Sequence, residues 1–598
     1  MGSLIAVSAS PALESPQELF RRCFEAAECS THTDASSTVN AERSFAASFP
    51  RRNGSHHPIA HDPRTGSWLA AIGSFFHESG HNTPDALLAQ YLAQDAERLG
   101  RSLEGFFAIV IGDAVKGEIS VITDVIGSCH LFARQLRGAV VLSSSSRMLA
   151  SLEDISLDPL ACHEFLSTGI IYEDRTIYNE VRKLPPASVI TYRNGQEVAR
   201  GVYWDISALS PNSLPGKTAT EALWHSLLSA TKKITSQFPR ISCDLTGGYD
   251  SRAVLAAFVG AGANFTTVVS GPENNPDVLI SRGLAKKLGL EHIHNLPCDY
   301  PSAQELTESL RLTDGEYDIV EYSSIERIHS KLSQSFDISV NGSFGEVARG
   351  YWWELLVPHT GQRRKLDSRK LARLRYAYCS SNDLFQNRFR IDLVDHVTAV
   401  INRTIGDLID YPNIFQMDAA YLRMRMQRWQ GRIASSTNRI WPCISPFMFR
   451  SVLEVMLQAE CSVRQRSLLI REMLSKFQPA IAAFPLEHGY PAIPATLATF
   501  MRFWPIIPGY ARKAFRKLVR RQQTVKGPSN GTSDLTTAAT REIAERLVSG
   551  LDQDSQLFDR EALDAFLKAS QRPDFSRHAE WNRLFSLTSA LKRETCQG

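Results

Sequence analysis

A short stretch of small, hydroxylated and acidic residues near the middle of the chain is the strongest candidate for chemistry. The apolar run 241–245 predicts a buried strand, and 253–258 predicts the first turns of a helix packed on it. Two glycines between them permit a sharp turn and a close approach of the backbone to a bound group. The start of the helix would present its N–H groups to an anion. The residues of this turn are Leu245, Thr246, Gly247, Gly248, Asp250 and Ser251.

The chemistry that this turn predicts is the binding of phosphate. Asp250 would supply an oxygen ligand to the Mg²⁺ that accompanies it. The turn is not a Walker loop, because no Gly-Lys-[Ser/Thr] follows the glycines. The alternative is an ordinary strand-to-helix turn in which the glycines serve packing alone. The turn by itself does not decide between the two.

The elements around the turn alternate between strands and helices, which predicts a doubly wound, mainly parallel sheet. The expected strands after the turn are 265–269, 292–296 and 337–340, and the expected helices are 218–233, 278–288, 303–312 and 322–332. Ligands of such sheets bind beyond the carboxyl ends of the strands. Asp250 lies there, as do Val269 and the loop 341–346, which contains Gly342 and Glu346.

The first third of the chain predicts a different, largely antiparallel α+β domain. Its expected strands are 68–73, 106–111, 119–123, 139–143, 188–192 and 197–203, and the first 65 residues show no firm strand signal. A stretch rich in Ser and Pro at 207–217 predicts a linker. We therefore expect domains at 1–206 and 218–500 and a basic, helical extension at 501–598.

Motifs from both halves, taken in order, resemble the asparagine synthetase superfamily. The N-terminal motifs are 103–108, Asp113, 123–127, 143–146, 183–187 and 203–205. The turn 246–251 resembles that family's Ser-Gly-Gly-x-Asp-Ser pyrophosphate loop, and 341–346 resembles its Ser-Gly-Glu-Gly-Ser-Asp-Glu segment. The resemblance covers about residues 66–490. It implies an N-terminal Ntn-hydrolase-like, class II glutaminase-like αββα domain, followed by an ATP-pyrophosphatase domain.

The resemblance also implies ATP and Mg²⁺ as cofactors of an AMP-forming carbon–nitrogen ligase. Asp250 and Glu346 would be the catalytic and metal-binding carboxylates. The residues that would bind the nucleotide are Leu245, Thr246, Gly247, Gly248, Asp250, Ser251, Val269 and Gly342.

Several departures from the family pattern narrow the function. The family's glutaminase uses a cysteine at position 2, where this chain has Gly2, and without a thiolate no glutamyl thioester can form. The nearest cysteines are Cys23 and Cys29. Glu487 stands where the family has an active-site lysine, which His488 or an arginine would have to replace. The loop 341–346 lacks the family's metal-binding aspartate.

Members of the superfamily without the cysteine include β-lactam synthetases and lasso peptide cyclases. Both activate a carboxylate as an acyl-adenylate, which an amine of the same substrate then attacks. The chain length and the basic C-terminal part favour a lasso cyclase that forms a macrolactam (isopeptide) in a precursor peptide, with a maturation protease as a further partner. The arginines between 423 and 439 would grip the peptide. An asparagine synthetase-like or β-lactam synthetase-like small-molecule amide synthetase and an ATP-binding pseudoenzyme remain the alternatives.

The composition is that of an ordinary globular protein, with 43% hydrophobic residues and a net charge of +3. This charge gives no argument for a nucleic-acid partner, and no apolar run approaches the ~20 residues of a membrane span. The ten cysteines are scattered as in a reducing cytoplasm, where we expect the protein. We expect Glu316, near a family acid, to lie in a solvated loop, and the basic segment 512–521 to be a solvated helix face. The alternative for that segment is an acidic partner, a peptide or a membrane surface.

Overall fold

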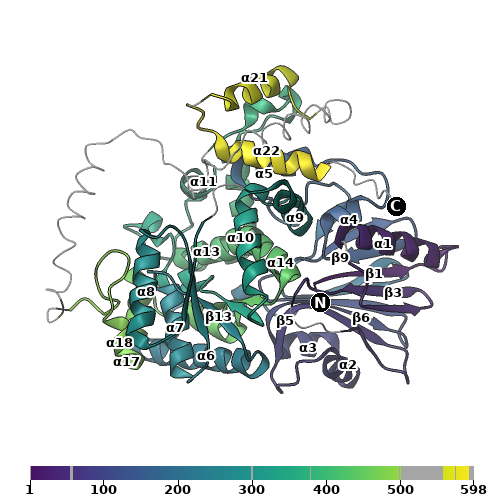
Figure 1. The fold of residues 1–598 in the computed structure, drawn as a ribbon. Helices are drawn as coiled ribbons and strands as arrows, with labels where there is room; N and C mark the ends of the chain where they lie inside the picture. The colour runs from purple at the N-terminus through teal and green to yellow at the C-terminus, as the bar shows by residue number, and fades with distance from the viewer. Residues whose placement is uncertain are drawn as a thin grey trace.

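The computed structural model describes residues 2–31, 33–53, 58–297, 301–377, 379–496, 499, 557–572 and 574–591. It contains two six-stranded antiparallel sheets in the N-terminal part and one five-stranded parallel sheet in the C-terminal part (Figure 1). This confirms the expected mixture of α+β and α/β architecture.

The two N-terminal sheets have the strand orders β10-β8-β9-β1-β3-β2 and β12-β11-β7-β6-β5-β4. The first sheet consists of β1 (Ser3–Ala9), β2 (Ser37–Ala41), β3 (Ser44–Phe49), β8 (Phe132–Leu136), β9 (Ala139–Ser143) and β10 (Val181–Lys183). The second consists of β4 (Ala60–His61), β5 (Trp68–His77), β6 (Leu103–Asp113), β7 (Glu118–Thr123), β11 (Ser188–Arg193) and β12 (Gln196–Val202).

Strand β1 shows how these sheets are layered. Its side chains alternate between two cores: Leu4 packs in the cluster of the second sheet, whereas Ile5 packs in the cluster of helix α1 (Pro16–Thr31). Helices α4 (Ser146–Ala150) and α5 (Pro159–Thr168) share the α1 side, and α2 (Pro84–Ala93) and α3 (Ala96–Ser102) cover the other (Figure 1). The αββα arrangement expected for this domain is therefore present.

The first 65 residues contain β1, β2 and β3, although their sequence carries no firm strand signal. These strands are built largely from Ser and Ala, and β1 is buried along its whole length. Small residues carry little β-propensity, so burial between a sheet and a helix decides their conformation.

The parallel sheet has the order β15-β14-β13-β16-β17, with β13 at its centre. Its strands are β13 (Ile241–Asp244), β14 (Thr266–Ser270), β15 (His292–Asn295), β16 (Ile338–Val340) and β17 (Cys443–Ile444). The helices between them are α6 (Gly216–Gln237), α7 (Asp250–Gly260), α8 (Pro276–Leu288), α9 (Ala303–Thr313) and α10 (Ile319–Leu332). These bounds lie within a few residues of the expected ones, and α6 begins inside the stretch predicted as a linker.

The remaining described elements are 3₁₀-helices, a π-helix and further α-helices. The 3₁₀-helices are η1 (Ile206–Ala208), η2 (Gly345–Arg349), η3 (Trp353–Leu356), η4 (Asn382–Leu384), η5 (Asn387–Phe389), η6 (Gly406–Leu408), η8 (Pro446–Met448) and η9 (Gln465–Ser467). The others are α11 (Ser368–Arg375), α12 (Leu393–Thr404), α13 (Asn413–Ala420), the π-helix η7 (Tyr421–Gln430), α14 (Gly431–Ile440), α15 (Arg450–Gln458), α16 (Cys461–Arg464), α17 (Leu468–Phe477), α18 (Pro479–Ala482), α21 (Arg560–Ser570) and α22 (His578–Leu591).

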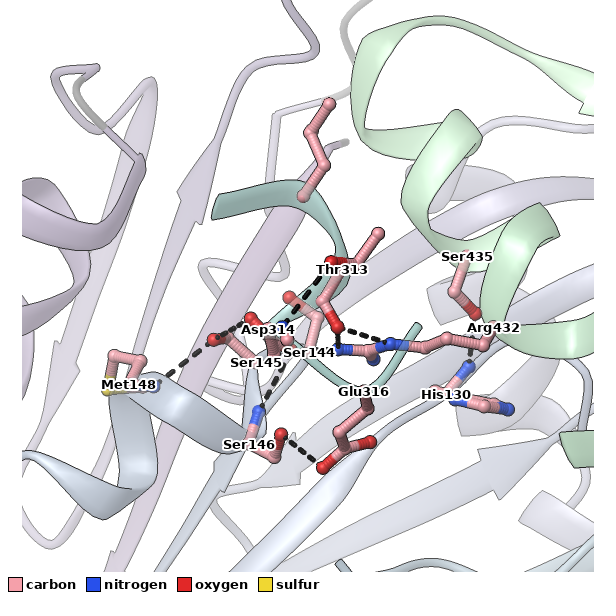
Figure 2. A network of polar contacts seen from close by, with 12 residues as sticks. His130, Ser144, Ser145, Ser146, Met148, Thr313, Asp314, Glu316, Arg432 and Ser435 are labelled. Atoms are coloured by element: carbon pink, nitrogen blue, oxygen red, sulfur yellow. Dashed lines mark hydrogen bonds and ion pairs between the residues drawn. The ribbon is translucent and has the colours of Figure 1, made fainter. Parts of the chain in front are cut away.

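A buried polar network joins the two parts of the molecule (Figure 2). Asp314, which follows α9, accepts hydrogen bonds from Ser145 Oγ at 2.7 Å and from the backbone N–H of Ser146 at 3.2 Å. Arg432 and Arg439 of α14 pair with the same carboxylate at 2.5 and 3.1 Å. Burial acts to raise the pKa of Asp314, but the two guanidinium groups outweigh it and lower this pKa to about 2.

The C-terminal helix α22 is part of the same junction. The Ser586 hydroxyl accepts a hydrogen bond from the N–H of Ile319, at the start of α10, and Tyr178 donates to the carbonyl of Ala590 at 3.2 Å. The basic segment 512–521 lies outside the described residues. Among the residues that are described, no helix is both long and apolar enough to cross a membrane. Cys29 is disulfide-bonded, so the expectation of reduced cysteines is wrong at that position.

Candidate functional site

The Gly-Gly turn at the carboxyl end of β13 is held by its own hydroxyl groups. Ser251 Oγ accepts a hydrogen bond from the N–H of Thr246 at 3.0 Å and contacts Thr246 Oγ1 at 2.9 Å. Gly247 donates its N–H to Asp277 Oδ1 at 2.7 Å. Helix α7 begins directly after this turn, and the side chain of Tyr249, its N-cap residue, makes no capping hydrogen bond. The turn therefore has the geometry of an anion site at a helix N-terminus.

Two carboxylates meet beside this helix start. Asp250 is the first residue of α7, and its Oδ1 is buried with no hydrogen-bond partner among the described residues. Glu346 Oε2 is likewise buried with no hydrogen-bond partner among the described residues. Burial and then the nearby charge of Glu346 raise the pKa of Asp250 to about 7, and Arg349, whose Nη2 lies 2.6 Å from Asp250 Oδ2, opposes that rise. Such a pair favours a cation between its members.

The pair alone would not fill the coordination sphere of a metal ion. In the described part of the chain no group of three or more His, Cys, Asp or Glu side chains is arranged to hold one. Mg²⁺ takes one or two carboxylates and completes an octahedron with water and phosphate oxygens. The two residues therefore fit an ion that arrives with a polyphosphate.

Two glycines allow the loop 341–346 to reach the start of α7. A Cβ at Gly342 would lie 2.6 Å from the backbone nitrogen of Ser251, and one at Gly345 would lie 2.7 Å from Asp250 Cβ. Any side chain at either position would push the two loops apart. Gly342 thus lies at the site, and its role in nucleotide binding stays a prediction.

The backbone on either side of Glu346 is strained. Phe344 has φ 73° and Trp352 has φ 64°, in the left-handed region that bulky residues avoid. Both side chains are buried, at 1% and 3% exposure. Backbone strain of this kind persists where surrounding packing enforces it and is concentrated at functional sites.

Leu245 and Val269 lie at the carboxyl ends of β13 and β14, at the same edge as Asp250. Both side chains are buried, at 0% and 2% exposure, and the N–H of Leu245 bonds to the carbonyl of Val268 at 2.8 Å. The structure thus brings the sequence-predicted residues together at one edge of the sheet. Which of them contact a nucleotide stays a prediction.

The turn 485–491 closes over the Gly-Gly turn from the other side. The N–H of Glu487 donates to the carbonyl of Gly247 at 3.2 Å. The buried guanidinium of Arg252 bonds to the carbonyls of Phe484 and Pro485 at 2.5 and 2.8 Å and so fixes this turn. Glu487 therefore lies next to the Gly-Gly turn.

Arginines, rather than a lysine, supply positive charge around this turn. Arg471 lies over the rings of Tyr249 and Tyr490, 5.4 Å from each ring centre, and Arg349 lies 5.9 Å from the ring of Tyr249. His488 is 3.2 Å from Glu487, and both side chains are about half exposed. Arg349 and Arg471 were missed as site residues because only the fold brings three distant segments around Tyr249.

The π-helix η7 lines the outer side of Glu346. Tyr421 lies close enough to Glu346 for the carboxylate to act on its pKa, and Gln430 Nε2 donates to Ser343 Oγ at 3.1 Å. Burial and then Glu346 raise the pKa of Tyr421 well above its ordinary value. A π-helix is rare and is frequent at functional sites.

Most arginines between 423 and 439 do not form the expected grip. Arg428 and Arg432 are buried and donate to the backbone carbonyls of Ile171 and Thr313 at 2.6 and 2.7 Å. Arg439 donates to the carbonyls of Arg311 and Leu312, and Arg423 pairs with Asp407 at 2.8 Å. These four side chains hold elements together. Arg425 is different, because its guanidinium stacks on aromatic rings.

Glu316 is not in a solvated loop, and that expectation is wrong. The residue is 7% exposed, and its Oε1 accepts a hydrogen bond from Ser146 Oγ at 2.8 Å (Figure 2). Burial raises its pKa, against the opposing charges of Arg432 and Arg428. The sequence around it resembles a surface turn because the N-terminal domain that covers it lies far away in the chain.

The start of β1 has no room for a nucleophile. A Cβ at Gly2 would lie 2.7 Å from the carbonyl oxygen of Pro50 and 3.0 Å from Arg51 Cα. Cys23 is fully buried, and burial raises the pKa of its thiol to about 12. Neither position offers a reactive thiolate.

Comparisons with known proteins agree with part of this description. Residues 78–204 match a family model described as a glutamine amidotransferase domain. No curated protein matches the chain. The match lies wholly within the αββα domain and suggests an enzyme of the amide-forming, amidotransferase type.

Two solved structures show a weak likeness. One is described as the structure of the allosteric regulatory enzyme of purine biosynthesis. Its sequence identity is 10%, the match covers 44% of this chain and 64% of that chain, and the TM-score is 0.23. The other is glutamine phosphoribosylpyrophosphate amidotransferase from B. subtilis complexed with ADP and GMP. Its sequence identity is 9%, the match covers 49% of this chain and 65% of that chain, and the TM-score is 0.25. The chain spans less than two thirds of either protein, and likeness of this extent supports no further conclusion.

Proposed function

We propose that this protein uses ATP to join a carboxylate to an amine and releases AMP and pyrophosphate. The observation that carries this proposal is the pair Asp250 and Glu346, beside the start of α7. Each has a buried oxygen without a partner among the described residues. The neighbouring glutamine amidotransferase-type domain supports the same nitrogen chemistry.

The side chains suggest how the first step would proceed. The carboxylate of the substrate would attack the α-phosphorus of ATP, forming an acyl-adenylate and releasing pyrophosphate. Mg²⁺ bound with the nucleotide would neutralise charge on its phosphates and would be held by Asp250 and Glu346. The N–H groups at the start of α7 and the guanidinium groups of Arg349 and Arg471 would stabilise the leaving pyrophosphate.

The amine in the second step would come from the substrate itself. Gly2 leaves no thiol to release ammonia from glutamine, and its surroundings admit no side chain. An amine in the same molecule gains effective molarity of up to ~10⁵–10⁸ M once it is held near the acyl-adenylate. We propose a peptide substrate that is closed to a macrolactam, as in lasso peptide cyclases, with a maturation protease as a further partner.

One observation favours a second candidate, an ATP-binding pseudoenzyme. The ion pair of Arg349 with Asp250 already occupies one oxygen that the metal ion would use. In an active enzyme this pair must loosen or share the carboxylate when the ion binds. A protein that binds the nucleotide without turnover would keep the ion pair between Arg349 and Asp250.

The test is ATP–pyrophosphate exchange together with mass spectrometry of candidate precursor peptides. Exchange and loss of one water from the peptide are expected, with AMP formed in equal amount. Asp250→Asn should abolish both, and Glu346→Gln should cost at least ~2 kcal/mol, roughly thirtyfold in rate. Asp337→Asn is the matched control, because Asp337 pairs with Arg240 just before β16, at the amino end of that strand. Full activity of Glu346→Gln across Mg²⁺ concentrations would contradict the assignment.

A further inference from the structure

Arg425 is the arginine of η7 whose guanidinium is held between aromatic rings. It lies 4.3 Å from the ring centre of Trp429 and 6.0 Å from that of Trp352. Within the described residues, no ion pair or hydrogen bond engages it. The neighbouring arginines, in contrast, are committed to carbonyls and carboxylates of the protein.

The position of Arg425 connects it to the carboxylate pair. Tyr421, one turn earlier on η7, lies close enough to Glu346 for that carboxylate to raise its pKa, and its ring lies 5.4 Å from that of Trp352. Arg425 contacts the same indole. Glu346, Tyr421, Trp352 and Arg425 therefore form a continuous row along one side of the site.

No described carboxylate forms an ion pair with Arg425. Its charge acts on the nearby Tyr317 and Tyr421, where those of Glu321, Asp318 and Glu346 oppose it. A guanidinium stacked on a ring keeps the N–H groups at its edge free in a fixed plane. Such an edge matches the two oxygens of a carboxylate.

A phosphate of ATP is a less suitable ligand for this residue. The Gly-Gly turn has its own guanidinium groups, since Arg349 and Arg471 both contact Tyr249. Arg425 contacts the rings of Trp429 and Trp352 instead, and neither Arg349 nor Arg471 contacts these two rings.

We propose that Arg425, held on Trp429 and Trp352, binds a second carboxylate of the substrate, one that does not react. This inference rests on the proposed function, because that proposal defines the substrate. The binding site itself requires neither ATP nor turnover. A carboxylate bound there would orient the rest of the substrate toward Glu346. Analogues in which this carboxylate is replaced by an amide would bind poorly.

The experiment measures direct binding of short peptides to the full chain in the absence of ATP and Mg²⁺. The probes are N-acetyl-Glu-Gly with a free C-terminus, its C-terminal amide, and N-acetyl-Gln-Gly with a free C-terminus. Together they separate a side-chain carboxylate from a C-terminal one. The doubly amidated N-acetyl-Gln-Gly-amide contains neither.

The expected result is that one of the two carboxylates is required, and that its removal weakens binding roughly tenfold or more, as for a charge-assisted bidentate contact. Arg425→Gln should produce the same loss. Arg425→Lys should recover only part of the affinity, because a lysine has neither the planar fork nor the stacking. Arg423→Gln, on the same helix but paired with Asp407, should bind as the parent does.

Equal affinity for the doubly amidated peptide would overturn the proposal on the unaltered protein, whatever the variants do. Unchanged affinity in Arg425→Gln would place the carboxylate elsewhere and would also overturn it. Failure of ATP–pyrophosphate exchange alongside Arg425-dependent binding would reject the proposed function and leave this site standing.

Discussion

Arg349 Nη2 lies 2.6 Å from Asp250 Oδ2, while Asp250 Oδ1 and Glu346 Oε2 are buried without partners among the described residues. One guanidinium thus supplies the positive charge beside two neighbouring carboxylates. The pair is the feature around which the proposed chemistry is arranged, and it makes a direct prediction about metal binding.

We expect Arg349→Gln to lower the melting temperature in metal-free buffer and to increase the gain in melting temperature on adding Mg²⁺. Without the guanidinium, the two carboxylates repel each other, so a divalent cation relieves a larger penalty. Arg240→Gln serves as the control, because the Arg240–Asp337 pair is largely exposed on the arginine side. Equal Mg²⁺ shifts in the parent and in Arg349→Gln would show that no ion enters between these carboxylates.

The second prediction concerns the contact of the loop 341–346 with α7. In Gly345→Ala the new Cβ would meet Asp250 Cβ and Cγ at 2.7 and 2.8 Å, so the carboxylate must move. A displacement near 1 Å costs roughly a hundredfold in rate. ATP–pyrophosphate exchange measures this loss. Gly406→Ala, where a Cβ would meet nothing within 4 Å, should be as active as the parent.

The carboxyl edge of the parallel sheet could be predicted from sequence because its signals are local. A buried strand, two glycines and an acid at a helix start specify Thr246–Ser251 without reference to the rest of the chain. The loop with Gly342 and Glu346 follows from the same alternation of strands and helices. What these residues bind stays a prediction.

The residues that sequence analysis missed are positioned by long-range packing. Arg471 of α17 and Arg349 of η2 meet at Tyr249 only when the sheet has formed. Glu316 resembles a surface residue until the N-terminal domain covers it. The sequence predicts that the arginines of η7 and α14 bind the peptide, because it shows only their charge. It does not show that Arg428 and Arg432 are buried and donate to backbone carbonyls.

The third prediction is that the protein releases no glutamate from glutamine, and that Gly2→Cys does not create this activity. The new thiol side chain would have to enter a space where Pro50 and Arg51 backbone atoms lie 2.7 to 3.0 Å from the Cβ position. A coupled glutamate assay checks both proteins. Glutamate release that survives Cys23→Ala would show that another nucleophile exists.

The fourth prediction is that Asp314→Asn destabilises the protein by about 3–5 kcal/mol near neutral pH, because it leaves Arg432 and Arg439 buried without their counterion. The folded pKa of Asp314, about 2, lies below the unfolded value of about 3.9. Its stabilisation is therefore present above pH ~4 and is lost as the pH falls toward 2.

Thermal melts between pH ~2 and ~7 test this prediction. The difference in melting temperature between the parent and Asp314→Asn should become smaller as the pH falls from ~4 toward ~2. Asp383→Asn, which removes a half-exposed partner of Arg577, should change the stability by no more than about 1 kcal/mol. A difference between parent and Asp314→Asn that stays constant down to the lowest pH would contradict the assignment.

The last prediction concerns His329, whose Nδ1 accepts a hydrogen bond from Trp441 Nε1 at 3.1 Å. Burial lowers the pKa of this imidazole to about 4, whereas the unfolded value is about 6.5. Between those two pH values the unfolded chain binds more protons, so stability falls as the pH falls from 6.5 to 4. The full loss attributable to this group is at most about 3 kcal/mol. In His329→Gln, which keeps an acceptor for the indole but does not titrate, the melting temperature should depend less on pH across this window. If the curves of the parent and His329→Gln run parallel across the window, the imidazole is not held neutral by the fold.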